Sequence, residues 1–334
     1  MSHDLVSVII PNYNGCRWLP KLLDSIAGQT ERRFRIVIVD DASTDDSVAF
    51  LRARWPDVAV IQNPRNMGFA ASCNRGIQSA ETPYIALLNN DTHVASAWLA
   101  EGLAPFAEPQ VGSVASLSLL AEPPHLIDTA GDLYSVAGGA VKRNHLLPAS
   151  TAEELSPRCF AASGVSAFYR REALMRVGGL DERFESYYED VDLGFRLAWA
   201  GYRCVFAVRS VCYHYLSSSY NPGGWRYHFN SARNAEWVWW ANMPAGLRRR
   251  HLMAHLAFLG LQSLNKLRQG HFLAYAAGKW AALRTRDHIR FKRGVVQRLA
   301  SVTAEEIEAR LVADWRSLHL RGRRAGRCKA VPAS

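Results

Sequence analysis

Acidic and amide side chains follow an apolar run in the first third of the chain. The run Tyr84–Leu88 reads YIALL, and Asn89, Asn90 and Asp91 come directly after it. Asn and Asp are among the poorest strand formers, and burying their polar groups unpaired costs free energy. Their oxygens are also suitable ligands for a hard divalent cation. These residues indicate a polar site at the end of a buried strand, with Asp91 as the main candidate metal ligand.

Three further polar groups follow other apolar runs. The first run leads into residues 11–15 (PNYNG), the second into Asp40 and Asp41, and the third into residues 63–66 (NPRN). A polar group after one strand is most often a turn or a helix cap. Four such groups at equivalent positions are better explained by a shared binding site.

The elements that position these groups alternate along residues 1–120. Strands are predicted at 5–10, 34–39, 58–61, 84–88 and 111–117, and helices at 17–27, 45–54, 68–80 and 95–106. This alternation predicts βαβ units and an α/β fold with a mostly parallel, buried sheet. Ligands of open sheets bind beyond the carboxyl ends of the strands. We therefore expect all four polar groups at one edge of the sheet.

A nucleotide is the expected ligand, yet the usual phosphate-binding motifs are absent. No G-x-G-x-x-G follows the first strand, and no G-x-x-x-x-G-K-[ST] occurs in the sequence. Their absence disfavours a nucleotide-dependent oxidoreductase, which is one alternative function. A divalent metal that joins a diphosphate to protein oxygens is a different way to hold the phosphates.

Basic charge is concentrated at the carboxyl end. Residues 241–334 carry 19 Lys and Arg against 5 Asp and Glu, a net charge of +14, whereas residues 1–240 carry 21 against 25, a net charge of −4. This asymmetry favours an anionic partner for the carboxyl end, either a membrane surface or nucleic acid. The six cysteines form no C-x-x-C pair, and the chain opens without a secretory leader, so a reducing, cytoplasmic setting is expected.

Helices are predicted beyond residue 220, at 225–242, 247–269 and 272–284. The apolar run 252–264 is shorter than the roughly 20 residues that span a bilayer, so no transmembrane helix is expected. Trp and Tyr beside Arg and Lys fit an amphipathic element at a membrane interface, and the alternative is an ordinary helical appendage packed on the core. The run 321–329 (RGRRAGRCK) predicts a basic, disordered tail.

Several motifs together resemble one family. They are SVIIPNYNG, VIVDDASTDDS, NPRNMGFAASCNRGI, LLNNDT, GGLDERFESYYEDVDLGFRLAWAGYRC and HYLSS, and they extend over residues 5–219. The series resembles the family 2 inverting glycosyltransferases, which have the GT-A fold. That resemblance implies a Rossmann-like central sheet flanked by helices and a sugar-nucleotide substrate.

The resemblance also implies a role for each matching residue. The nucleotide-sugar site would comprise Pro11, Tyr13, Asn14, Asp40, Asp41, Asn66, Gly68, Asn74 and Asn90. The sequence NND is similar to the D-x-D motif of the family, but Asn89 replaces its first acid, so Asp91 is the main metal ligand. His214 lies where family members place an imidazole that reaches the metal or the diphosphate. Mg²⁺ or Mn²⁺ is the expected metal.

Glu189 and Asp190 are the candidate catalytic residues. Two carboxylates at the start of a helix can simply complement the helix dipole, which is the alternative role. By resemblance, Asp190 is the general base that deprotonates an acceptor hydroxyl. Asp192 and Arg196 are spaced as an intrahelical ion pair and are expected to support the structure.

The resemblance predicts a catalytic domain at 1–220, with a nucleotide-binding half at 1–120 and an acceptor half at 121–220. A helical, basic, membrane-associating region at 221–320 and a tail at 321–334 follow. The region 233–244 resembles bacterial rhamnosyltransferase-like members. The implied activity is transfer from dTDP-rhamnose, or alternatively a UDP-sugar, to a saccharide or polyprenyl-linked acceptor in cell-surface polysaccharide synthesis. A peripheral position at the inner face of the plasma membrane and no nucleic-acid partner are expected. The alternative is a non-catalytic, sugar-nucleotide-binding scaffold.

Overall fold

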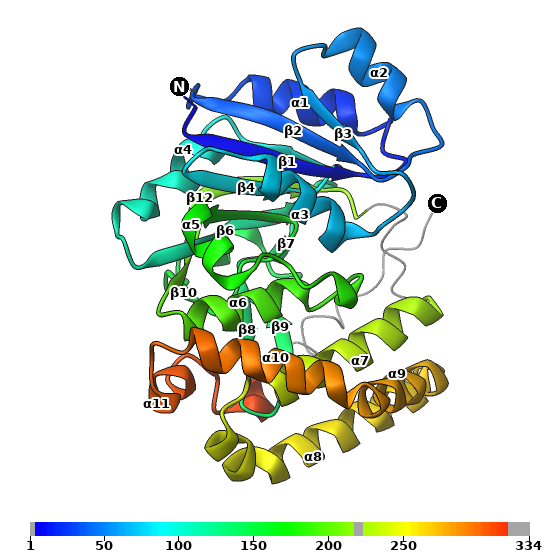
Figure 1. The fold of residues 1–334 in the computed structure, drawn as a ribbon, viewed down its shortest axis with the longest axis vertical. Helices are drawn as coiled ribbons and strands as arrows, with labels where there is room; N and C mark the ends of the chain where they lie inside the picture. The colour runs from blue at the N-terminus through cyan, green and yellow to red at the C-terminus, as the bar shows by residue number, and fades with distance from the viewer. Residues whose placement is uncertain (1–3, 217–222, 320–334) are drawn as a thin grey trace.

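The computed structural model describes residues 4–216 and 223–319 (Figure 1). The strands are β1 Val6–Asn12, β2 Phe34–Asp40, β3 Ala59–Gln62, β4 Tyr84–Leu88, β5 Thr92–Val94, β6 Val111–Leu120, β7 Ile127–Thr129, β8 Asp132–Tyr134, β9 Ala140–Lys142, β10 Arg158–Cys159, β11 Ser166–Arg170 and β12 Arg203–His214. The α-helices are α1 Leu19–Ala27, α2 Ser47–Arg54, α3 Phe69–Ser79, α4 Trp98–Leu103, α5 Arg171–Val177, α6 Glu189–Trp199, α7 Trp225–Asn242, α8 Ala245–Arg268, α9 Phe272–Arg284, α10 Arg286–Leu299 and α11 Ala304–Glu308. The predicted tail at 321–334 and residues 217 and 218 of the HYLSS motif lie outside the described residues.

A central sheet has the strand order β10-β12-β6-β11-β4-β1-β2-β3, with β5 beside β12 and β7 beside β6. The strands β3, β2, β1 and β4 run parallel, and β11 is antiparallel to both β4 and β6. Asn12 pairs with Asp40 in register, so the carboxyl ends of β1 and β2 are level. The predicted α/β fold with a mostly parallel sheet is confirmed.

Both faces of the sheet are buried, as its parallel part requires. Along β1, Val8 and Ile10 pack in one hydrophobic cluster with residues of α1 and α4, whereas Ile9 packs in another with residues of α3 and α5. Figure 1 shows these helix pairs on opposite sides of the sheet. Because successive side chains of a strand point to opposite faces, the uninterrupted apolar run Val8–Ile10 contributes to both clusters.

Several elements differ from the predicted ones, and two of the differences bear on the site and the carboxyl-terminal helices. The run Arg203–Val208 predicts a short strand, but β12 continues from Arg203 to His214. A register shift in its pairing with β6 separates Ala207 from Val211. The helices α10 and α11 were not predicted. α10 has few apolar residues and many Arg and Lys residues, and its buried stripe consists of His288, Ile289, Lys292 and Val296, so two of the four buried residues are polar and the apolar signal in the sequence is small.

The carboxyl-terminal helices share a core with the acceptor half. Trp237 and Trp239 of α7, Phe195 of α6 and Tyr134 of β8 belong to one hydrophobic cluster. α9 packs closely on α7 because Gly278 has no side chain: an added Cβ would lie 2.3 Å from the Phe229 carbonyl oxygen. The core therefore continues across the boundary predicted at residue 220, and the division into domains stays a prediction.

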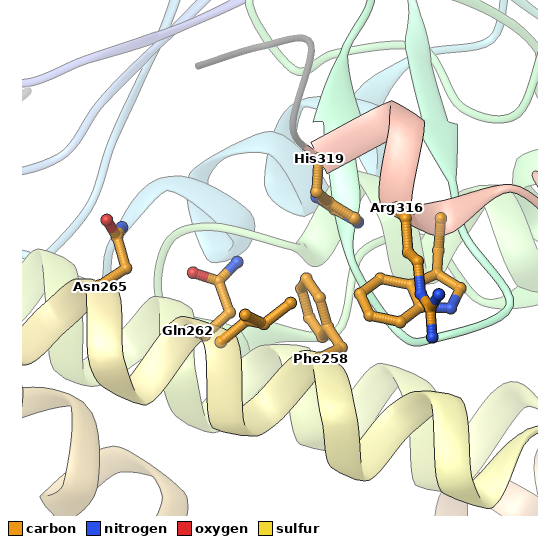
Figure 2. A pocket seen from close by; sticks show the side chains of 7 residues that line it. Phe258, Gln262, Asn265, Arg316 and His319 are labelled. Carbon is orange, nitrogen blue, oxygen red and sulfur yellow. The ribbon is translucent and has the colours of Figure 1, made fainter.

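The last described residues pack against α8 (Figure 2). The ring centroids of Phe258 and His319 are 4.6 Å apart, and those of Phe258 and Trp315 are 6.2 Å apart. A cavity of about 170 Å³ lies beside these rings and is also lined by Gln262 and Arg316. None of the helices in residues 4–216 and 223–319 combines the length and apolar character that a membrane span needs.

Candidate active site

The ends of β1 and β2 are joined by a buried carboxylate. Asp40 is 1% exposed, and its Oδ2 accepts hydrogen bonds from Asn12 Nδ2 at 2.9 Å and from Ser43 Oγ at 2.6 Å. Its Oδ1 accepts from the Ser43 backbone N–H at 3.0 Å. Asp40 therefore fixes the loops at the sheet edge, and Pro11 lies in β1 immediately before Asn12.

The loop after β1 presents an aromatic ring to solvent. Tyr13 is 45% exposed, while the neighbouring Asn14 adopts a positive φ of 50°. Asn14 Oδ1 accepts from the Thr44 N–H at 2.8 Å, and its own N–H donates to Ser43 Oγ at 2.9 Å. These bonds hold Tyr13 at the edge of the sheet, where an exposed ring is able to stack on a planar base.

Asp41 holds the loop that leads into α3. Its Oδ1 accepts from Asn63 Nδ2 at 2.6 Å and from the Met67 N–H at 2.7 Å, and its Oδ2 accepts from the Gly68 N–H at 2.8 Å. Gly68 has a φ of +89°, which favours glycine. Asn66 is an exposed residue of this loop. Both oxygens of Asp41 thus have partners in the protein.

Among the described residues, the side chain of Asn74 forms hydrogen bonds with residues 180 and 182 and not with the loops at the sheet edge. Its Nδ2 donates to the Leu180 carbonyl oxygen at 2.8 Å and to Glu182 Oε1 at 3.0 Å, and its Oδ1 accepts from the Leu180 N–H at 2.9 Å. The side chain is buried. Asn74 therefore ties α3 to the turn that precedes α6, and its amide is already satisfied within the protein.

The residues after β4 face the ends of β1 and β12. Asn90 Nδ2 donates to Asn12 Oδ1 at 2.9 Å. The backbone of Asn89 is held on both sides, because its N–H donates to the Val165 carbonyl and its carbonyl accepts from Thr92 Oγ1. These bonds account for the cluster at the end of YIALL: the strand ends at the junction of several polar loops.

His214 lies beside Asp91. Its Nε2 is 3.3 Å from Asp91 Oδ1, and its Nδ1 donates to Asp128 Oδ2 at 2.9 Å. The other oxygen of Asp128 accepts from Lys142 Nζ at 2.7 Å. Asp128 thereby fixes the imidazole so that Nε2 points to Asp91, the second-sphere arrangement that is common for metal-ligating histidines.

The charges of this cluster shift the pKa of its members. Burial lowers the pKa of His214, but the carboxylates of Asp128 and Asp91 outweigh it and raise that pKa to about 9. Burial raises the pKa of Asp128, but Lys142 and His214 bring it well below its ordinary value. The two carboxylates therefore favour a positive charge at His214, where Nε2 faces Asp91.

The donor set fits a metal that shares its coordination with a ligand. Within residues 4–216 and 223–319, no three His, Cys, Asp or Glu side chains lie together as a metal-binding group. Asp91 and His214 converge as a carboxylate and an imidazole, which Mn²⁺ and Mg²⁺ can use when oxygens of a bound ligand complete the shell. The structure brings together two of the three predicted ligands and gives Asn89 backbone contacts nearby.

A turn that contains residues with positive φ immediately precedes Glu189 and Asp190. Glu185, Tyr187 and Tyr188 have φ values of 61°, 72° and 71°, which cost roughly 1 kcal/mol or more each in residues other than glycine. α6 begins at the next residue. This strained turn sets the direction in which the two carboxylates leave the backbone.

The turn is held by one side chain of α7. Asn234 is fully buried, and its Nδ2 lies 3.0, 3.0 and 2.8 Å from the carbonyl oxygens of Phe184, Ser186 and Tyr187. Arg233 Nη2 donates more weakly to the Phe184 carbonyl at 3.3 Å. The carboxyl-terminal helices therefore stabilise the conformation that places the candidate base.

The two carboxylates differ in their surroundings. Glu189 is buried, and its Oε2 has no hydrogen-bond partner among the described residues. Asp190 is half-buried; its Oδ2 accepts from the Gly164 N–H at 3.0 Å and its Oδ1 from the Val191 N–H at 2.8 Å. Asp190 is therefore the more accessible of the two.

The pKa values of three carboxyl groups are raised here. Burial, then the charge of Asp190, raises the pKa of Glu189 well above its ordinary value and that of Asp132 to about 8. Burial also raises the pKa of Asp190, while backbone N–H groups and Lys142 oppose it. Lys142 therefore interacts electrostatically with both groups: it pairs with Asp128 beside His214, and its charge opposes the rise that burial causes in the pKa of Asp190.

Sequence reasoning missed four residues of this site: Asp128, Asp132, Lys142 and Asn234. Three of them lie in the stretch 121–156, where short strands and loops leave no periodic pattern. Asn234 lies in the region 233–244, whose resemblance implies no role for it. The predicted intrahelical pair is confirmed, since Arg196 Nε donates to Asp192 Oδ2 at 2.9 Å.

Curated relatives share this sequence pattern. The N-acetylglucosaminyl-diphospho-decaprenol L-rhamnosyltransferase of Mycobacterium tuberculosis (strain CDC 1551 / Oshkosh) is 29% identical over 242 residues, which cover 65% of this chain and 78% of the relative. The pre-mycofactocin glycosyltransferase of the same strain is 32% identical over 216 residues, covering 64% of this chain and 43% of the relative.

Solved structures share the fold at lower identity. The mannosyltransferase PcManGT from Pyrobaculum calidifontis, in complex with GDP-Man and Mn²⁺, matches with a TM-score of 0.52 and 19% identity over 86% of both chains. GalNAc-T7 with UDP, GalNAc and Mn²⁺ matches with a TM-score of 0.56 and 20% identity over 69% of this chain and 47% of its own. The family model described as glycosyl transferase family 2 matches residues 7–178, just over half of the chain. The chain belongs to glycosyl transferase family 2.

Proposed function

We propose that the protein is a metal-dependent, inverting glycosyltransferase that uses a nucleoside-diphosphate sugar. The observation that carries the proposal is the Asp91–His214 pair. Asp128 orients the imidazole of His214 and also binds Lys142, and the charge of Lys142 opposes the rise that burial causes in the pKa of Asp190. The charge of one lysine, Lys142, therefore acts both on the cation site and on the candidate base. Sugar transfer with inversion needs those two functions on opposite sides of the sugar.

The residues divide the chemistry between them. Asp190 accepts the proton of an acceptor hydroxyl as that oxygen attacks the anomeric carbon, and a single displacement of this kind inverts the configuration. Its raised pKa makes the carboxylate a stronger base than a free aspartate. A divalent metal, when bound by Asp91 and His214, would neutralise the charge that grows on the leaving diphosphate. Tyr13 and the loops that Asp40 and Asp41 fix would hold the nucleotide.

Rhamnose is the proposed donor sugar. The name of the mycobacterial relative states transfer of L-rhamnose to N-acetylglucosaminyl-diphospho-decaprenol. We infer dTDP-rhamnose as the donor and a polyprenyl-linked or other saccharide of the cell envelope as the acceptor, with a UDP-sugar as the alternative donor. The complexes of the structural neighbours with nucleotides or nucleotide sugars and Mn²⁺ support a metal-bound diphosphate.

The outward faces of α8 and α9 support a peripheral position on a membrane. The two helices bury one side, including Phe258 of α8 and Tyr275 of α9, yet their opposite sides are also apolar. The most exposed of these residues are Met253 and Leu273, each 74% exposed, Leu267 at 62% and Trp280 at 60%. Extended apolar faces of this kind mark an interaction surface.

Charge favours an anionic bilayer as the occupant of this surface. Residues 241–334 carry a net charge of +14. A basic region beside exposed Leu, Met and Trp side chains is attracted to acidic headgroups and inserts its apolar groups between them. We therefore propose that the catalytic residues act at the inner face of the plasma membrane, where a polyprenyl-linked acceptor is anchored.

A screen of nucleotide sugars tests the proposed activity. Purified protein is mixed with each donor and a polyprenyl-diphosphate saccharide, with Mn²⁺, with Mg²⁺ or with EDTA. We expect product from dTDP-rhamnose with either metal and none with EDTA. Tight donor binding without transfer or hydrolysis under any of these conditions would favour the alternative, a scaffold protein that binds sugar nucleotides.

A further inference from the structure

A crevice lies where the end of α7, the start of α8 and the middle of α10 meet. Its volume is about 170 Å³, and it is lined by residues that include Trp199, Arg248, Arg293 and Gln297. Trp199 ends α6, whereas Asp190 lies in its first turn. Nine residues of helix separate them by about 14 Å, so the crevice is distinct from the candidate active site.

Two arginine side chains converge in this crevice. Arg293 Nε donates to the Trp240 carbonyl oxygen at 2.8 Å, and Arg248 Nη1 donates to the same oxygen at 3.4 Å and to the Met243 carbonyl at 2.5 Å. Each guanidinium carries five N–H donors, and these bonds use only a few of them. Both side chains are only partly buried, so their remaining donors are accessible from the crevice.

The two charges have no carboxylate partner within the described ranges. No Asp or Glu lines the crevice, and no ion pair to Arg248 or Arg293 occurs among residues 4–216 and 223–319. Other partly buried cations differ: Arg233 pairs with Glu185, and Lys292, one residue before Arg293, pairs with Asp181. The positive field at the crevice is therefore uncompensated.

The proton affinities of the pair agree with this geometry. Burial, then repulsion from Arg293 and Arg249, lowers the pKa of Arg248 to about 10. Burial, then repulsion from Arg290, lowers the pKa of Arg293. Both groups stay charged at neutral pH, and each is repelled by a neighbouring arginine. An anion held between Arg248 and Arg293 would relieve that repulsion.

We propose that the crevice binds a phosphate group, with Arg248 and Arg293 as its ligands. The planar fork of a guanidinium matches two oxygens of a phosphate, and charge-assisted bonds of this kind are stronger than neutral ones. The first N–H groups of α8, a helix of 24 residues with no side-chain cap, adjoin the same crevice through Ala245 and add favourable dipoles.

The phosphate has two possible sources. Leu252 lies one helical turn after Arg248 on α8 and is itself exposed, so the crevice adjoins the apolar face of that helix. A phospholipid headgroup would reach Arg248 and Arg293 while its acyl chains lie beside Leu252. A soluble phosphate or diphosphate would use the same two ligands. The site does not depend on the proposed transferase activity, and its test does not measure transfer.

Two binding measurements test the proposal. Both are made in EDTA, which removes divalent cations and so prevents binding at any metal-dependent diphosphate site. Calorimetric titration with inorganic phosphate and with pyrophosphate gives the affinity for the soluble source. Flotation with vesicles of phosphatidylcholine, with or without phosphatidic acid, gives the affinity for the headgroup. The double variant Arg248→Gln/Arg293→Gln keeps side-chain donors for the Trp240 carbonyl and loses both charges. We expect at least about 10-fold weaker binding of whichever source the wild type recognises.

Two further variants make the result specific. Arg286→Gln/Arg298→Gln removes the same charge from exposed positions of α10 outside the crevice and is expected to bind nearly as the wild type does. Gln297→Glu places a carboxylate among the lining residues without removing a hydrogen bond, so it should block the anion even if the double variant fails to fold. Equal losses in the crevice and control variants, or no binding of phosphate, pyrophosphate or acidic vesicles by the wild type, would overturn the proposal.

Discussion

His214 Nε2 and Asp91 Oδ1 lie 3.3 Å apart across the pairing of β5 with β12. The two residues are distant in sequence. The pairing of Thr92 with His214 and two hydrogen bonds keep them in place: the Tyr215 N–H donates to the Asp91 carbonyl, and Asp128 accepts from His214 Nδ1. An imidazole and a carboxylate fixed in this way offer one lone pair each to a single cation. In the family pattern an acid at position 89 would contribute as well, and here that position is Asn.

The first prediction concerns this pair. Asp91→Ala should abolish the metal-dependent part of donor binding, because it removes the main charged ligand. Asn89→Ala should weaken donor binding only a few-fold, since an uncharged amide adds little electrostatic stabilisation to a cation. Calorimetric titration of the donor in Mn²⁺ and in EDTA measures both variants. If the Asp91→Ala protein binds the donor in Mn²⁺ as tightly as the wild type, the metal assignment fails.

The second prediction concerns Asn234 as a positioning residue. Asn234→Ala removes the amide that donates to the carbonyl oxygens of Phe184, Ser186 and Tyr187, so the left-handed turn before Asp190 loses its support. Turnover should fall by about 10- to 100-fold, because a small displacement of a catalytic group is enough for such a loss. Donor affinity should stay close to that of the wild type.

Asn230 supplies the matched control for Asn234. It lies one turn earlier on α7, is equally buried, and its Nδ2 has no hydrogen-bond partner among the described residues. Asn230→Ala should therefore leave turnover nearly unchanged. Parallel losses of turnover in the two variants, or a parallel loss of donor affinity in Asn234→Ala, would mean that general destabilisation of α7 explains the effect.

The third prediction uses the pKa of Asp132, which burial and the charge of Asp190 raise to about 8. Below about pH 4 this residue is protonated in both the folded and the unfolded chain. As the pH rises from 4 to 8, the unfolded chain releases the proton while the folded protein keeps it, so the wild type loses stability over that window. Asp132→Asn has no proton to release.

The stability of Asp132→Asn relative to the wild type should therefore increase from pH 5 to pH 8. Urea unfolding of both proteins at the two pH values, in EDTA, gives the difference in the free energy of unfolding. A difference that is the same at pH 5 and pH 8 would show that Asp132 has an ordinary pKa in the folded protein.

The fourth prediction concerns the apolar face of α8. Met253→Asn/Leu267→Asn replaces two highly exposed apolar side chains, so the folded protein should keep its stability. Partitioning into vesicles with acidic lipid should weaken by roughly 10-fold or more, since each side chain contributes on the order of 1.5 kcal/mol when buried. Wild-type binding should also decrease at high salt, because salt screens exposed charges.

Met175 provides the control for this face. It is 50% exposed on α5, away from the carboxyl-terminal helices, so Met175→Asn should not change partitioning. Vesicle binding that is equal in all three proteins would show that α8 does not contact the membrane.

The parallel part of the sheet was predictable because each strand shows both an apolar run and polar residues at its carboxyl end. The strand Tyr84–Leu88 is apolar on both faces and ends at amides, and the structure has β4 at those positions. The polar groups after β1, β2 and β4 meet because parallel strands in register end at one edge. Those relations depend on local pattern and on strand direction, both of which can be read from sequence.

Asp128, Lys142 and Asn234 depend on pairings between distant segments. Asp128 lies in the three-residue strand β7, which is positioned by β6, and Lys142 in β9, which pairs only with β8. Neither strand has enough residues for a periodic pattern. Asn234 acts on carbonyl oxygens some 50 residues earlier in the chain, and backbone acceptors carry no sequence signature.

The central claim is that Asp190 deprotonates the acceptor, and the most direct test compares Asp190→Asn with Glu189→Gln. Single-turnover transfer and donor affinity are measured for each variant in Mn²⁺. Because a general base contributes on the order of 10²- to 10⁴-fold in rate, Asp190→Asn should lose transfer by that factor and keep donor affinity within about twofold. Glu189→Gln should retain most of its rate. Near-normal transfer in Asp190→Asn together with collapse in Glu189→Gln would contradict the account and assign the base to Glu189.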